Sequence, residues 1–423
     1  MKEANYPRAT ISDSLIMGDH AVSMCKDGAE SIACLGVDFM AESVSAILDK
    51  NGFGHVPVYR AKEKFIGCTL ADSAEKDAYR AWLHRARDQG GKALHVVYIN
   101  TSLETKAVSS SIVPTITCTS SNVVRTMLQA AAQVGPDLKI YYGPDTYMGE
   151  NLRRFFQTVA TWDDKKIASE LHPAHNSKSI HALIDGLDVF PSGNCLVHHM
   201  FGSDVVDTNR THYDDAYVTA HLEVPGEMFE IAMEKSLEGR GGVGSTSDIL
   251  KFISSKISAA VEKDTKEHTC LKFILGTEAG MVTSIVRSIN DILDKHGSDN
   301  VEAEIIFPVA SEAVFAVEDG KDFAVVPGVS GGEGCSTSGG CATCPYMKMN
   351  DVDSLIDIAD MVLDKDNKVN RMKLIGHQPA DRLKGKMLGG KKASDLGTEP
   401  ILFMRHLMKE SSLPDDLMQR IVS

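Results

Sequence analysis

Apolar residues along the chain form two kinds of pattern. Short runs rich in β-branched and aromatic residues are typical of strands, and apolar residues three and four positions apart are typical of amphipathic helices. The strand-like runs cover residues 31–37, 55–60, 93–99, 139–143, 195–201, 217–224, 272–277 and 304–309. The helical patterns cover residues 70–88, 122–134, 226–237, 246–261 and 278–296. This alternation predicts an α/β fold in which amphipathic helices cover parallel sheets.

Polar residues follow most of the strand-like runs, at the sheet edge where parallel α/β sheets bind ligands. They are Cys68, Asn100, residues 119–122, Asp145, His198, His199, His221, Glu223, residues 244–247, Thr277, Glu278 and the glycine-rich segment 328–345. Residues 346–423 are helical in pattern and more charged, so we expect them to form an extension outside the catalytic unit.

Cysteine supplies the strongest chemical signal. Cys335, Cys341 and Cys344 lie in a glycine-rich loop, and their spacing does not fit the paired cysteines of a zinc ribbon. Cys68 and Cys195 stand beside strand-like runs and supply further candidate thiolates. Three thiolates on a 4Fe-4S cluster leave one iron free to act as a Lewis acid that assists loss of water. Zinc held with ligands from elsewhere, and cysteines that merely pack in the core, remain as alternatives.

Two segments rich in Ser and Thr, residues 119–122 and 244–247, each stand at the start of a helical pattern. Hydroxyl groups there cap a helix, while free backbone N–H groups and the helix dipole form a ready site for an anion. Capping alone explains either segment, but two such segments in one chain favour a phosphate or dicarboxylate ligand.

Two pairs of polar residues have the two-residue spacing of a strand. Tyr98 and Asn100 form one pair and His221 and Glu223 the other, and we expect each pair to point to one side. A histidine and a carboxylate on one face can act as general acid and base, or simply hydrogen-bond each other. His198 follows a candidate ligand, Cys195, by three residues, so we expect it near the same centre.

The charge balance restricts the partners. The chain has 423 residues with 44 Lys+Arg against 58 Asp+Glu, and this net charge of -14 argues against nucleic acid as a partner. Neither a membrane-spanning apolar run nor the apolar core of a signal peptide is visible, so no membrane association is expected. Nine cysteines without close pairing favour a reducing compartment, and the expected location is the cytoplasm.

A series of segments, taken in order, carries a family resemblance. They are LGVDFMAESVSAIL (35–48), IGCTLADSAE (66–75), YINTS (98–102), TCTSSNVV (117–124), PDTYMGENL (144–152), CLVHHMF (195–201), AHLEVP (220–225), GSTSDIL (244–250) and GGCATCPYMKMN (339–350). None of them is specific alone, but in their number and order the chain resembles the quinolinate synthase family, in particular its longer variety.

The resemblance implies an architecture. Three similar three-layer α/β/α units with parallel sheets would surround a pseudo-threefold axis, followed by a helical C-terminal extension. The units would cover residues 1–90 with the Cys68 loop, 91–185 with the segments at 98–102 and 119–122, and 186–345 with the Cys195 and Cys344 loops, and the extension would cover 346–423. A 4Fe-4S cluster would be held by Cys68, Cys195 and Cys344, leaving Cys335 and Cys341 as loop thiols.

The resemblance also implies a reaction, the condensation of iminoaspartate with dihydroxyacetone phosphate to quinolinate with loss of water and phosphate, in NAD biosynthesis. An enzyme that supplies iminoaspartate would be a partner. The catalytic residues implied are Tyr98, His198, His221 and Glu223, and the substrate-binding residues are Asn100, Ser120, Ser245 and Thr246.

Two departures from the family pattern stand near the beginning of the chain. The family's opening strand with a His and a Tyr is not visible, and a helix start that carries a serine in relatives reads here Gly18, Asp19, His20. We expect His20 to take the place of that serine in binding phosphate, the alternative being that the site itself is altered. Two other functions therefore remain open: an iron-sulfur hydro-lyase acting on another hydroxy acid, and a cluster-binding protein that has lost catalysis.

Overall fold

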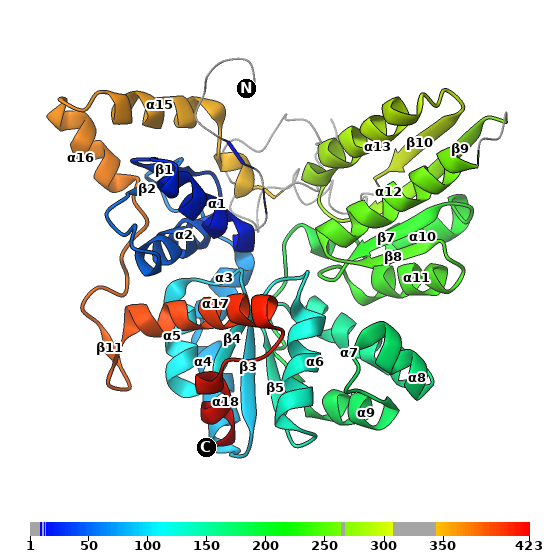
Figure 1. Ribbon diagram of the computed structural model, residues 1–423, viewed down its shortest axis with the longest axis horizontal. Coiled ribbons are helices and arrows are strands. Elements are labelled where there is room, and N and C mark those ends of the chain that lie inside the picture. Colours follow the sequence, from blue (N-terminus) through cyan, green and yellow to red (C-terminus); the bar gives the residue numbers. More distant parts are fainter. Residues whose placement is uncertain (1–8, 11, 13, 264–266, 308–343) are drawn as a thin grey trace.

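The computed structural model contains, in the part of the chain it describes, two four-stranded parallel sheets and one two-stranded parallel sheet (Figure 1). It describes residues 9, 10, 12, 14–263, 267–307 and 344–423. Helices connect the strands throughout, so the predicted α/β class is confirmed.

The sheet within residues 93–189 has the strand order β4-β3-β5-β6. Its strands are β3 (Ala93–Tyr98), β4 (Thr115–Cys118), β5 (Lys139–Gly143) and β6 (Leu187–Val189). The helices between them are α5 (Leu103–Ile112), α6 (Val123–Val134), α7 (Thr146–Ala160), α8 (Asp164–Lys166), η1 (Ile167–Leu171) and α9 (Ser177–Gly186). All of β3 is buried because α4 (Asp77–Asp88) covers one face with Tyr79 and Trp82, while Leu94 and Val96 join the main core.

The sheet within residues 217–306 has the strand order β10-β9-β7-β8. Its strands are β7 (Tyr217–His221), β8 (Gly241–Gly244), β9 (Thr269–Gly276) and β10 (Val301–Ile306). Its helices are α10 (Ser203–His212), α11 (Gly226–Leu237), α12 (Thr246–Glu262), η3 (Ala279–Met281) and α13 (Val282–His296). Ile249, Ile253 and Ile257 lie at helical spacing on α12 and pack against Phe273 of β9.

The two-stranded sheet pairs β1 (Ile32–Cys34) with β2 (Val58–Arg60), beside α1 (Ser14–Lys26), α2 (Asp38–Lys50) and α3 (Thr69–Glu75). Gly18 lies inside α1, where a Cβ atom would stand 2.3 Å from Cδ1 of Ile47, so the glycine permits close packing of α1 on α2. The expectation of a helix start at residues 18–20 is therefore wrong.

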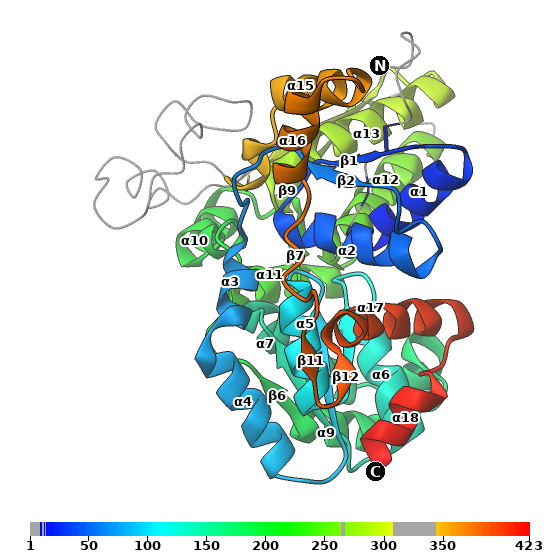
Figure 2. The same cartoon turned by 90° about the vertical axis from the view of Figure 1, so that its left-hand side faces the viewer.

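The C-terminal residues are helical, as the sequence predicts. They contain η4 (Met347–Met349), α15 (Val352–Leu363), α16 (Lys368–Gly376), β11 (Met387–Leu388), β12 (Lys391–Lys392), α17 (Ala393–Glu410) and α18 (Asp415–Val422). Figures 1 and 2 show α17 lying along α5, and a Cβ atom on Gly397 would stand 2.7 Å from the carbonyl oxygen of Leu103. Among the described helices, none is long and apolar enough to span a bilayer.

Segment 195–201 does not form the predicted strand. It forms a turn followed by η2 (His198–Met200), because the carbonyl of Cys195 accepts the N–H of His199 at 3.0 Å and closes a helical turn. Strand β7 likewise ends at His221, two residues before Glu223.

Candidate active site and cluster ligands

Three of the described cysteines stand immediately before helical turns. Cys68 precedes α3, Cys195 lies in the turn before η2, and Cys344 precedes η4. In each case the sulfur accepts a hydrogen bond from a backbone N–H two or three residues further on. Each local backbone therefore presents amide dipoles to its sulfur, and such hydrogen bonds are among the features that tune an iron-sulfur cluster. Cys335 and Cys341 lie outside the described residues.

The three cysteine loops contact one another. The hydroxyl of Thr69 donates to the carbonyl of Asn194 at 2.9 Å and joins the first loop to the second. Tyr346, two residues after Cys344, packs in the same apolar cluster as Cys68 and joins the third loop to the first. The structure thus brings the three predicted ligands into one region.

The charge balance around these thiols fits a metal cluster. Burial raises the pKa of Cys68 to about 12 and also raises the pKa values of Cys195 and Cys344. The charges of Cys344 and of Glu223 add to the rise at Cys68, whereas the backbone N–H groups of Leu70 and Ala71 oppose it. Thiols whose pKa values are raised by burial and by nearby negative charge become thiolates when a cationic centre binds them. None of the described cysteines forms a disulfide.

Glu223 lies at the centre of the predicted catalytic residues and is 4% exposed. Its Oε1 accepts a hydrogen bond from the Tyr98 hydroxyl at 2.5 Å, and its Oε2 lies 3.0 Å from Nδ1 of His198. Nδ1 of His221 lies 3.7 Å from Oε1 and accepts the backbone N–H of Glu223 at 3.3 Å. The two imidazole rings are stacked with centroids 4.8 Å apart. All four predicted catalytic residues therefore meet at one carboxylate.

The protonation states in this group differ sharply. Burial alone would raise the pKa of Glu223, but His198, then His221 and the Tyr98 hydrogen bond, lower it to about 2. Burial lowers the pKa of His221 to about 4, against the opposing charge of Glu223. Burial and Glu223 raise the pKa of Tyr98 well above its usual value. At neutral pH the site therefore contains an ionised carboxylate, a neutral imidazole and a phenol that keeps its proton.

Cys195, His198 and Glu223 can also share a metal ion. Their potential ligand atoms all lie within 4.8 Å of one another. Nδ1 of His198 has no aligned hydrogen-bond partner among the described residues, although it is at ion-pair distance from Glu223. Sulfur, nitrogen and oxygen donors in one buried group are typical of metal ligation.

The two predicted anion sites do stand at helix starts. Ser120 lies between β4 and α6, where Asn122 accepts the N–H of Thr119 at 2.8 Å and Ser120 itself is half-buried. Ser245 is the N-cap of α12 and forms a capping box with Asp248. Thr246 follows as the first residue of that helix.

The two remaining substrate-binding residues lie in different surroundings. Asn100 is outside β3, at the middle of a three-residue turn closed by the N–H of Thr101 and the carbonyl of Ile99 at 2.7 Å. His20 is half-buried in the second turn of α1 and is not at a helix start. The geometry therefore gives His20 no helix-terminal amides with which to hold an anion.

Two acidic residues near the site were assigned no role from the sequence. Asp145 is completely buried after β5, where its Oδ1 accepts the N–H of Met148 at 2.9 Å. Glu278 follows β9, accepts the backbone N–H of Cys344 and interacts with His198. Their position directly after strands could have marked them as site residues. Their partners come from distant parts of the chain, so the sequence did not indicate a role for either.

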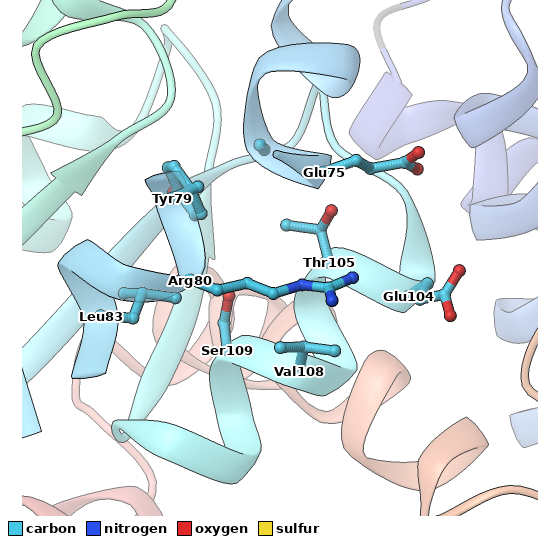
Figure 3. Close-up of a pocket in the computed structure, with 9 residues that line it drawn as sticks. Glu75, Tyr79, Arg80, Leu83, Glu104, Thr105, Val108 and Ser109 are labelled. Atoms are coloured by element: carbon cyan, nitrogen blue, oxygen red, sulfur yellow. The ribbon is translucent and has the colours of Figure 1, made fainter. Parts of the chain in front are cut away.

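A surface cavity of about 80 Å³ lies between α4 and α5 (Figure 3). It is lined by Ala74, Glu75, Tyr79, Arg80, Leu83, Glu104, Thr105, Val108 and Ser109. A second cavity of about 320 Å³ lies between α6 and α9 and includes His175. Neither contains a predicted site residue, so these cavities are separate from the cysteine and Glu223 groups.

Comparison with known proteins gives consistent matches. A family model described as quinolinate synthetase A protein matches residues 6–296. A rice protein (Oryza sativa subsp. japonica) named quinolinate synthase, chloroplastic, is 48% identical over 435 residues, covering 99% of this chain and 60% of that protein. The Arabidopsis thaliana protein of that name is 47% identical, covering 100% and 58%. A quinolinate synthase of Sulfurisphaera tokodaii is 26% identical, covering 78% and 74%.

The comparison also bears on location and on length. The relatives from rice, Arabidopsis and tobacco are named chloroplastic, so the expected cytoplasmic location is wrong. The chain spans about three fifths of the length of these plant relatives. Since the family model covers residues 6–296 and the rice relative is 48% identical along nearly the whole chain, the chain belongs to the quinolinate synthetase A protein family.

Proposed function

We propose that this chain is a quinolinate synthase, condensing iminoaspartate with dihydroxyacetone phosphate to quinolinate with loss of water and phosphate, in NAD biosynthesis. One observation carries the proposal: three cysteine loops meet beside a buried carboxylate that two histidines and a tyrosine surround. Dehydration needs a Lewis acid for the departing hydroxyl and groups that move protons, and this arrangement offers both.

We propose that Cys68, Cys195 and Cys344 hold a 4Fe-4S cluster. The open iron of such a cluster would supply Lewis acidity toward a substrate hydroxyl. We further propose that three α/β units surround a pseudo-threefold axis with the cluster at their centre. The separate sheets support this, since the three cysteines come after β2, β6 and β10.

The proton-transferring groups have distinct roles in this proposal. Glu223 is ionised and can accept a proton from a substrate carbon or nitrogen. Tyr98 keeps its proton, and its hydrogen bond to Glu223 gives a direct path between them. His198 and His221 flank the carboxylate, so they can stabilise its charge and exchange protons with it.

The substrate's anionic groups would be held by neutral donors. The Ser120 hydroxyl, and the start of α12 with Ser245 and Thr246, would bind phosphate, because helix-terminal amides and hydroxyls complement its charge. The Asn100 side chain would bind a carboxylate or hydroxyl group from the turn after β3. His20 stays a proposed phosphate contact from a helix interior.

The cellular setting follows from the relatives' names. We propose a plastid location for this chain, because the plant relatives are named chloroplastic. An enzyme that releases iminoaspartate would have to act in the same compartment, since iminoaspartate is the nitrogen donor of the proposed reaction.

The proposal is tested with protein purified without oxygen. The wild type should show cluster absorbance and form quinolinate from iminoaspartate and dihydroxyacetone phosphate. Cys195→Ala should lose both signals, whereas the matched control Cys270→Ala, at an exposed cysteine, should keep both. A Cys195→Ala protein with full cluster absorbance and activity would rule the scheme out, and so would a cluster-loaded wild type that forms no quinolinate.

A further inference from the structure

The C-terminal residues contact the loops that carry the proposed site, although the family model ends at residue 296. Arg60, at the end of β2, donates its backbone N–H to the carbonyl of His377 at 2.7 Å and a guanidinium N–H to the carbonyl of Gly376 at 2.9 Å. Arg60 also forms a buried ion pair with Asp38, whose other oxygen accepts the N–H of Ile66 at 2.9 Å. The extension thus lies against the start of the Cys68 loop.

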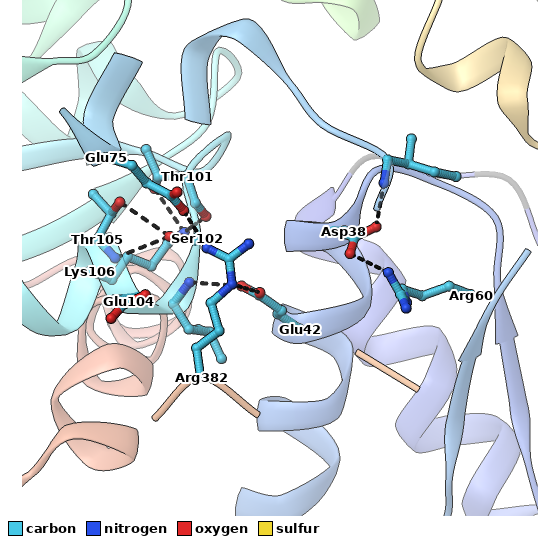
Figure 4. Close-up of polar contacts among 12 residues, drawn as sticks. Asp38, Glu42, Arg60, Glu75, Thr101, Ser102, Glu104, Thr105, Lys106 and Arg382 are labelled. Atoms are coloured by element: carbon cyan, nitrogen blue, oxygen red, sulfur yellow. Dashed lines mark hydrogen bonds and ion pairs between the residues drawn. The ribbon is translucent and has the colours of Figure 1, made fainter. Parts of the chain in front are cut away.

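Arg382 lies between that loop and α2 (Figure 4). Its Nη1 donates to Oε1 of Glu75 at 2.8 Å, and Glu75 is the last residue of α3, the helix that begins directly after Cys68. Its guanidinium also lies 5.2 Å from the ring centroid of Phe65, three residues before Cys68. One side chain therefore contacts both sides of the Cys68 loop.

The same guanidinium reaches toward the loop that follows β3. Its Nε lies 4.0 Å from Oε1 of Glu42, which is 7% exposed. The other oxygen of Glu42 accepts the backbone N–H of Leu103 at 3.0 Å, the first residue of α5. Glu42 therefore links Arg382 to the segment that carries Asn100.

Lys106 holds the other side of the Asn100 turn. Its Nζ is fully buried, and burial lowers its pKa to about 7. Nζ donates to the carbonyls of Ile99 and Thr101 and to Oγ1 of Thr101, the first and the last of these at 3.1 and 2.9 Å. Lys106 therefore holds the residues on either side of Asn100 from within α5. The second contact of this segment is the hydrogen bond from Leu103 to Glu42 of α2. Arg382 acts on this second contact, because its guanidinium lies beside the Glu42 carboxylate.

We propose that Arg382 is a positioning residue that couples the Cys68 loop to the Asn100 turn, so that residues outside the family model help to assemble the site. The proposal rests on the proposed function in that Cys68 and Asn100 are the ligand and substrate-binding residues named there. An arginine suits this task because its planar guanidinium can bind two carboxylates and stack on a ring at once.

The test uses the full chain in its metal-free form. The alkylation rates of Cys68 and Cys195 are measured by mass spectrometry of their peptides, with amide hydrogen exchange of the peptide spanning residues 99–103. Arg382→Met should raise both the Cys68 rate and the exchange rate roughly fivefold, as loss of a partly exposed ion pair and ring contact allows. Cys195 should change less than Cys68, because its loop meets the Cys68 loop at the Thr69 hydrogen bond and makes no contact with Arg382 in the interactions above. Arg382→Lys, which keeps the charge but loses the planar fork, should lie between Arg382→Met and the wild type.

Lys386→Met is the matched control, because Lys386 lies on the same segment and forms an exposed ion pair with Glu104 at 2.9 Å. The proposal is overturned if Arg382→Met leaves Cys68 and residues 99–103 unchanged, if the control has the same effect, or if Cys195 changes equally, which would mean general loosening. These readouts need neither cluster nor substrate. If the wild type formed no quinolinate, the proposed function would be wrong, but the coupling by Arg382 would still be decided by the alkylation and exchange rates.

Discussion

The two four-stranded sheets present different chemistry at their carboxyl ends. The sheet of residues 93–189 ends in Tyr98, Asn100, Ser120 and Asn122, which are neutral groups that can donate hydrogen bonds. The sheet of residues 217–306 ends in His221, Glu223 and Glu278, which are titratable. The hydrogen bond from Tyr98 to Glu223 joins residues 125 positions apart and connects the two ends. We call the first end the binding side and the second the proton-transfer side, after the groups that are most frequent at each. Two exceptions are Ser245 with Thr246, a neutral anion site at the second end, and Tyr98, a proton-transferring group at the first.

This division has a physical reason. A phosphate or dicarboxylate is held best by neutral donors whose hydrogen bonds do not change with pH, whereas acid–base chemistry assigns its acid and its base to titratable groups whose surroundings push their pKa values apart. Glu223, with a pKa of about 2, and Tyr98, with a raised pKa, provide that difference at one contact. Variants at the two sheet ends should therefore affect different kinetic constants.

Glu223→Gln should have the largest effect. The amide can still accept the Tyr98 hydrogen bond but cannot take a proton, so kcat should fall about 10²–10⁴-fold while KM stays within a few-fold. Steady-state quinolinate formation measures both constants. Glu230→Gln, at an exposed residue of α11, is the control and should behave like the wild type. A rise in KM alone would place Glu223 on the binding side and break the division.

Acid should weaken the binding-side sheet through His95. This residue is completely buried in β3, where its Nε2 lies 2.8 Å from the Tyr79 hydroxyl, and burial lowers its pKa to about 3. The unfolded chain takes up the proton near pH 6.5, so this contribution to stability is complete above pH 6.5 and is lost as pH falls toward 3. The loss at pH 5 should be about 2 kcal/mol.

The measurement is the melting temperature between pH 5 and 7 for the wild type and for His95→Gln, which lacks the titrating imidazole. The variant should show a shallower decline with acid, and hydrogen exchange in β3 should rise less. His84→Gln, at an exposed residue of α4, should keep the wild-type pH dependence. Equal slopes for His95→Gln and the wild type would show that other groups dominate acid sensitivity.

The two helix starts should respond differently to loss of a hydroxyl. Ser245 donates to Oδ2 of Asp248 at 2.6 Å and accepts the N–H of that residue at 3.3 Å, so its hydroxyl is already occupied. Ser245→Ala should lower stability by about 1 kcal/mol, as for a lost helix cap, and should raise KM less than Ser120→Ala does because the amides at the start of α12 remain. Ser120→Ala should instead leave the melting temperature unchanged and raise KM for dihydroxyacetone phosphate roughly tenfold. If Ser245→Ala instead raised KM and Ser120→Ala instead lowered the melting temperature, the start of α12 would be the stronger phosphate site.

The fold was predictable where an apolar pattern begins and ends at clear sequence signals. Residues 139–143 form β5 as predicted, and residues 226–237 form α11, which begins directly after Pro225. Strand β8 was not predicted because Gly241 and Gly242 have no apolar side chains, and the strand depends on close packing: a Cβ on Gly241 would stand 2.0 Å from the carbonyl of Ala232. Such a contact is a tertiary property that no local pattern reveals.

The site residues were less predictable from the residue pattern than the fold was. From their place in the sequence alone, Cys68 and Cys195 could equally be ligands or core residues, and the family resemblance grouped them with Cys344. The contact between Glu278 and the amide of Cys344 joins the end of β9 to a loop 66 residues later, so it required the folded structure. The roles of these residues stay predictions until the variants above are measured.

Asp145 is the exception on the binding side, because it is an acid. It is completely buried, its Oδ2 has no hydrogen-bond partner among the described residues, and burial followed by the charge of Glu223 raises its pKa well above the usual range. A carboxyl that stays protonated is a neutral group, which agrees with its neighbours. Asp145→Asn keeps both the neutrality and a favoured helix-capping residue, so kcat and KM should stay within about threefold of the wild type. Steady-state kinetics would show a larger loss if the ionised carboxylate were needed, and the binding side would then contain a titrating group of its own.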